Sequence, residues 1–130
     1  MPGVSGAGSL IRGVGPLGLG VMSKAFQKEV LGQLRKHGSD ISKPHNFEFY
    51  LHVPTKAHAE KAVVKIRASS FAGATLSRCT SGSGWLCLAT KTIVPAKADL
   101  ADHARFFEQI AAALGGEFDG WEAKIVETLL

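Results

Sequence analysis

The sequence predicts an α+β domain with the ferredoxin-like split βαβ order (βαββαβ), a four-stranded antiparallel sheet and one extra N-terminal helix. Segments whose apolar residues recur every three or four positions alternate with segments whose apolar residues recur every second position. A chain of 130 residues, 45% of them hydrophobic, is enough for one core of ordinary size. No apolar stretch reaches the ~18 residues of a membrane-spanning helix, so we expect a soluble, cytoplasmic domain.

Residues 1–22 differ in composition from the rest of the chain. They hold seven of the fifteen glycines, and Arg12 is their only charged residue. Because they show no periodic apolar face, we expect a flexible tail at 1–22 and a folded domain at 23–130. Glycines interrupt the apolar core that a signal peptide requires. Met22 stands directly before the first periodic segment and is therefore a candidate translation start.

Three helices are expected from their apolar stripes and their ends. The first begins at Ser23 and stops at Gly38, the second follows a cap at Thr55, and the third spans about 98–114 before Gly115-Gly116. The stripes are, in order, Phe26, Val30 and Leu34; Ala59, Ala62, Val63 and Ile66; and Leu100, Ala104, Phe107, Ala111 and Leu114.

Four strands are expected at 46–53, 73–80, 85–94 and 118–126. In the first, Phe47, Phe49, Leu51 and Val53 share one face by alternation, and Asn46, Glu48, Tyr50 and His52 share the other. The second and third strands form a hairpin around a Ser-Gly-Ser-Gly turn at 81–84.

The sheet face that the two main helices leave uncovered is the first candidate site. The first and third strands are neighbours in this topology, so we expect Tyr50 and His52 beside Trp85 and Cys87 on that face. Three covers are considered: the helix at 23–38, a second copy of the chain, or a different partner. A deep pocket lined by these four residues would instead indicate a small-ligand binder or an enzyme.

Other chemistry finds little support in the sequence. Cys79 and Cys87 lack zinc-ligand neighbours and are expected to be reduced thiols, although an odd-length hairpin loop would place them opposite one another. The run at 82–84 lacks the lysine of a phosphate-binding loop, and the strand from Trp85 lacks the paired aromatics of an RNA-recognition motif. We therefore predict no catalytic residue, no metal, no cofactor and no direct nucleic-acid binding.

A second candidate site is the acidic cluster of Glu117, Asp119 and Glu122 near Trp121. Carboxylates beside an indole suit a sugar or a cation. In the simpler interpretation, Asp119-Gly120 is a turn pair and Trp121 anchors the last strand to the core.

Three segments resemble the RraB family, the regulators of RNase E activity: the run at 115–123 with its Asp-Gly-Trp-Glu, the segment at 40–50 with Pro44-His45, and the run at 81–90. Together they extend the resemblance over roughly residues 23–127. It implies a small bacterial, non-catalytic module that binds and inhibits an RNase E-type endoribonuclease. The expected partner-binding residues are Tyr50, His52, Trp85, Glu117, Asp119 and Glu122, and the expected structural motif is Asp119, Gly120, Trp121 and Glu122.

The net charge departs from what the resemblance implies. The family's inhibitor is acidic and suits an arginine-rich segment of its partner, whereas this chain carries +4. A basic protein needs a local acidic patch to bind a basic segment. Glu117, Asp119, Glu122 and Glu127 are the acidic residues expected to form it.

Overall fold

The computed structural model describes residues 10–14, 23–79 and 82–127. Within these ranges the elements are β1 (Leu10–Val14), α1 (Ser23–Lys36), β2 (His45–Val53), α2 (Lys56–Arg67), β3 (Gly73–Arg78), β4 (Trp85–Ile93), α3 (Leu100–Leu114) and β5 (Glu117–Lys124).

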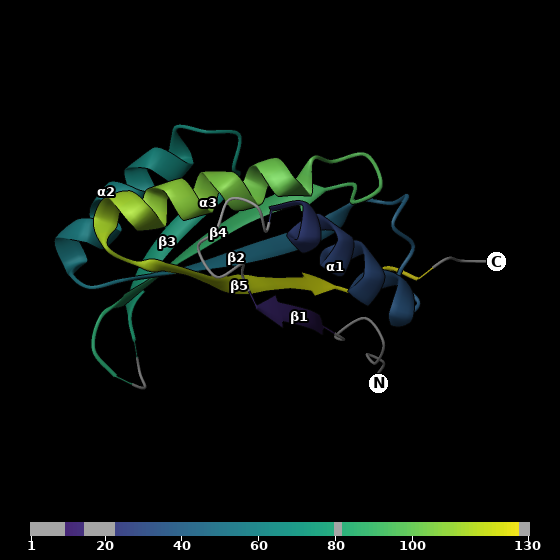
Figure 1. Cartoon of the computed structure of the whole chain (residues 1–130), viewed down its shortest axis with the longest axis horizontal. Helices are drawn as coiled ribbons and strands as arrows, with labels where there is room; N and C mark the ends of the chain where they lie inside the picture. Colours follow the sequence, from purple (N-terminus) through teal and green to yellow (C-terminus); the bar gives the residue numbers. More distant parts are fainter. Residues whose placement is uncertain (1–9, 15–22, 80–81, 128–130) are drawn as a thin grey trace.

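The strands form one antiparallel sheet with the order β1-β5-β2-β4-β3 (Figure 1). The predicted α+β class is confirmed, with three helices beside the sheet in the described part of the chain. Residues 10–14 differ from the expected flexible tail because they form β1, which adds a strand to the expected four by pairing with β5. The remaining residues of that expected tail, 1–9 and 15–22, lie outside the described ranges.

One face of the sheet packs against the helices and forms the core. Phe47, Phe49, Leu51 and Val53 of β2 are fully buried, as their alternation predicts. The ring of Phe49 lies 5.1 Å from that of Phe107 on α3, so the central strand and this helix meet directly. The expected stripes of α2 and α3 are buried as well.

The first helix packs on this same face. The ring of Phe26 on α1 lies 5.6 Å from that of Phe118, and the Phe118 position pairs with the buried Leu51. Gln27 also accepts a hydrogen bond from the backbone N–H of Ala101 at the start of α3 (3.2 Å). Of the three covers considered for the opposite face, α1 is therefore excluded. The apolar stripe of α1 packs beside α3, at the β5 side of the helix layer.

The register of the β3–β4 hairpin also differs from the expectation. Leu76 pairs with Cys87 and Arg78 pairs with Trp85, so Cys79 is not opposite Cys87. Because the loop from Cys79 to Gly84 has an even number of residues, the register is shifted, and such a shift moves side chains to the other face. Cys79 and Cys87 are both free thiols.

None of the helices in the described ranges is long and apolar enough to cross a membrane.

Candidate functional site

The candidate site is the sheet face opposite the helices, which no described element covers. Register places Tyr50 opposite Leu88 and His52 opposite Leu86 on this face. All four side chains are half-buried. Glu48 pairs with Glu122, and Glu117 pairs with His52, so both glutamates lie on the same face. The result is a partly apolar surface with carboxylates along its β2–β5 side.

Tyr50 is held by two carboxylates. Its hydroxyl donates to Glu122 Oε1 at 2.6 Å and lies 3.3 Å from Glu48 Oε1. The pKa of Tyr50 is raised well above its usual value. Burial is the main cause, and the hydrogen bond to Glu122 is the second. The hydroxyl therefore stays protonated and remains a donor. Glu122 is only 4% exposed, so the expectation that it forms part of an exposed acidic patch is wrong.

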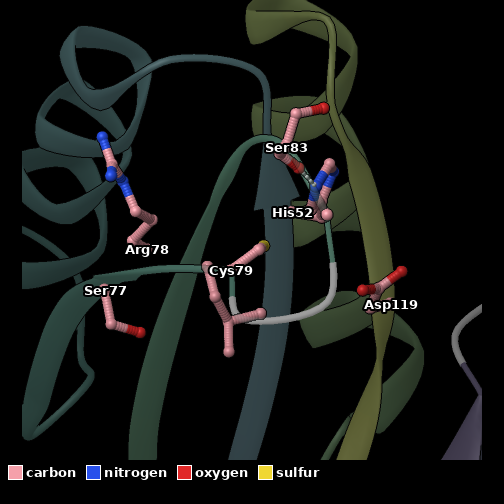
Figure 2. A pocket seen from close by; sticks show the side chains of 8 residues that line it. His52, Ser77, Arg78, Cys79, Ser83 and Asp119 are labelled. Atoms are coloured by element: carbon pink, nitrogen blue, oxygen red, sulfur yellow. Dashed lines mark hydrogen bonds between the residues drawn. The ribbon is translucent and has the colours of Figure 1, made fainter.

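His52 lies at the end of this face, beside a recess of about 400 Å³. Its Nε2 is 3.1 Å from the carbonyl oxygen of Ser83, which ties the β3–β4 loop to the end of β2. Figure 2 shows His52 next to Ser83, with Cys79 and Asp119 on its two sides and the Arg78 side chain directed away. His52 thus bonds to the loop, while Tyr50 bonds to the carboxylates.

The Asp119-Gly120 pair lies inside β5 instead of forming a turn. Tyr50 pairs with Gly120 but Leu51 pairs with Phe118, so Asp119 is the extra residue of a β-bulge. Gly120 has φ of 149°, a conformation that favours glycine. The bulge leaves Asp119 exposed while Trp121 is 1% exposed in the core. Trp121 therefore cannot offer its ring to a sugar or cation at the surface, as one interpretation of the acidic cluster required.

Trp85 and Cys87 lie on the helix-covered face, so the expectation that they join Tyr50 and His52 is wrong. Cys87 is fully buried and its Sγ lies 3.6 Å from the Ala59 carbonyl oxygen. Burial raises the pKa of the Cys87 thiol to about 11, which makes it a poor nucleophile. The ring of Trp85 instead lies near two cations, with its centroid 5.8 Å from Lys56 Nζ and 5.8 Å from Arg78 Cζ. The alternative ligand site is therefore not assembled.

A buried Ser-His pair was not predicted from the sequence. Ser39 Oγ lies 2.6 Å from His45 Nε2, while His45 Nδ1 lies 2.8 Å from the Lys43 carbonyl oxygen and therefore donates to it. Ser39 Oγ also accepts from the Val126 backbone N–H at 2.8 Å. These bonds tie the segment after β5 to the start of β2, and the pair is buried, with Ser39 7% and His45 0% exposed. Pro44-His45 in the family-like segment was the available signal.

No cluster of three or more His, Cys, Asp or Glu residues suited to a metal ion occurs among the described residues. These observations define a small α+β domain with a helix layer on one face of an antiparallel sheet and a partly apolar, partly acidic opposite face. Residues 24–123 match the sequence model of the family described as "Regulator of ribonuclease activity B". The chain therefore belongs to the RraB family, a family of regulators of ribonuclease activity. No curated protein sequence gives a significant match.

Proposed function

We propose that this chain regulates an endoribonuclease of the RNase E type by binding it as a protein partner, without chemistry of its own. Its place of action would be the cytoplasm. The proposed unit is the domain from Ser23 onward, to which we assign the ferredoxin-like arrangement with α1 as an added helix. The strand order β5-β2-β4-β3 within the family-matched residues supports this assignment.

The observation that carries the proposal is the sheet face left uncovered by the described elements. Leu86 and Leu88 are half-buried there and supply apolar contact area next to Tyr50. Partner surfaces combine such an apolar centre with a polar rim. The hydroxyl of Tyr50 is already engaged, so its ring edge is the part left for contact.

Charge on this face suits a basic partner. Glu48 is half-buried on it, and Glu117 and Asp119 are exposed at its β5 side. The exposed cations Lys61, Lys65 and Arg105 belong to α2 and α3, on the other side of the sheet from Glu117 and Asp119. Acidic groups at the rim of an interface favour the approach of a basic partner segment. A local group of carboxylates can therefore serve a basic partner although the chain as a whole carries +4.

Paired charge reversals test the proposal. Glu117→Lys with Asp119→Lys should weaken capture of an RNase E-type enzyme about tenfold at low salt, and by less at high salt, because exposed charges are screened. Glu29→Lys with Glu60→Lys on the exposed side of α1 and α2 is the matched control, with the same change in net charge.

Capture would be measured by surface plasmon resonance, and inhibition by cleavage of a labelled RNA, at two salt concentrations. If both pairs of substitutions weakened capture equally, net charge alone would determine binding, and the sheet face would not be the binding surface. Signal from RNA alone on the chip would indicate direct RNA binding instead. Self-association at the same face would appear as a dimer in sedimentation, and the reversed pair would abolish it.

A further inference from the structure

The outer edge of β5 is occupied by a short strand of the same chain. β1 pairs with β5 from Leu10 opposite Lys124 to Val14 opposite Gly120, at the margin of the sheet (Figure 1). Its contacts are mainly with β5 and, more sparingly, with α1. The family match begins at residue 24, so β1 lies outside the matched domain. Without β1, β5 would be an edge strand with unpaired backbone groups, the kind of edge that accepts another strand.

Two buried residues of β5 lie at the centre of this pairing. With β1 in place, Trp121 and Glu122 are 1% and 4% exposed. Gly13 stands opposite Trp121 and Arg12 stands opposite Glu122. In this register glycine brings no side chain to the position paired with Trp121, and opposite charges at directly paired positions of a ladder are favourable. A strand that fits this edge therefore carries a basic residue followed by glycine, in the order that β1 supplies.

We propose that the outer edge of β5 is a binding site for an extended segment of the regulated ribonuclease that contains a basic residue followed by glycine. β1 fills this site within the chain and is displaced when the partner strand binds. Main-chain hydrogen bonds to β5 supply affinity, and the positions opposite Glu122 and Trp121 supply selectivity. Because the site is open only when β1 is released, the apparent affinity falls in proportion to the released fraction. This inference rests on the proposed function, and it adds that β1 limits binding of the ribonuclease by occupying the site.

The test compares three forms of the full chain. Arg12→Glu with Gly13→Pro is the released form, because it sets like charges opposite each other and places proline in the strand. Leu10→Cys with Lys124→Cys is the locked form, because this opposed pair can be oxidised to a disulfide. The locked form also carries Cys79→Ser, since that thiol is partly exposed. The third form is the unaltered chain.

The probe is a fluorescein-labelled peptide of residues 8–16, Gly-Ser-Leu-Ile-Arg-Gly-Val-Gly-Pro, followed by fluorescence anisotropy. We expect the released form to bind it at least tenfold more tightly than the unaltered chain, and the oxidised locked form not to bind. Dithiothreitol should restore binding by the locked form to the level of the unaltered chain. A peptide with glutamate in place of the arginine should bind at least tenfold more weakly. Equal binding by all forms, or none by the folded released form, would overturn the strand site.

Circular dichroism melts establish that each form is folded. The same three forms are then titrated with the ribonuclease. The order released, unaltered, locked in decreasing affinity supports the proposal, whereas equal affinities overturn the partner assignment. A released form that exchanges strands with a second copy, seen as a dimer by light scattering, would assign the edge to self-association and also overturn it. Failure of the proposed function is distinct, since the ribonuclease would then bind no form while the peptide still binds.

Discussion

Trp121 should contribute more to stability than any other side chain of the family-like segment at 115–123. It is 1% exposed, and its ring centroid lies 5.9 Å from that of Phe47. Replacing a buried Trp by Ala costs about 3–5 kcal/mol, from lost burial and the cavity that remains. With a urea m-value of about 2 kcal/mol/M, Trp121→Ala should lower the unfolding midpoint by roughly 2 M.

The indole N–H makes this prediction sharper. Trp121 Nε1 is buried and has no hydrogen-bond partner in the described part of the chain. Trp121→Phe keeps a ring beside Phe47 and removes that unsatisfied donor, whose burial costs about 1–3 kcal/mol. We therefore expect Phe to be far less destabilising than Ala. Urea unfolding followed by far-UV circular dichroism measures both, with half-exposed Trp85→Ala as the control. An unchanged midpoint in Trp121→Ala, or equal losses for Phe and Ala, would refute the reasoning.

Two further predictions concern Cys87 and the glycines. The Cys87 pKa rises from 9.0 to about 11 on folding, so the unfolded chain loses this proton first. The stabilising contribution of the neutral thiol is complete below pH 9 and is lost towards pH 11, up to about 2–3 kcal/mol. The free energies of unfolding of the parent and of Cys87→Ala, measured with urea, should therefore converge over this range. A constant difference between them would contradict the prediction. Gly84→Ala should lower the melting temperature by several degrees, since φ is 100° and the new Cβ would lie 2.5 Å from His52 Nε2. Gly32→Ala on α1 has open space and should instead raise stability by about 0.5–1 kcal/mol; calorimetry showing the same sign for both would refute the steric argument.

Only part of the candidate site could be predicted from sequence patterns. The alternation along β2 correctly placed Tyr50 and His52 on the face away from the buried phenylalanines. Trp85 and Cys87 were assigned to the wrong face because the hairpin register depends on loop length, and an even loop reverses the assignment. The burial of Glu122 was also unpredictable, since the hydrogen bond from Tyr50 joins residues 72 positions apart in the sequence.

The sequence by itself determined the helices, the strands of the family-matched region and the buried side of β2, because these depend on local periodicity and on capping residues such as Thr55. Tertiary structure decided where these elements lie. It placed α1 beside α3, left the other sheet face without cover from the described elements, and paired Leu10–Val14 with β5. Such pairings are set by contacts between distant segments. The five residues Leu-Ile-Arg-Gly-Val, interrupted by a glycine, are too short a local signal to reveal a strand before the edge that accepts it is known.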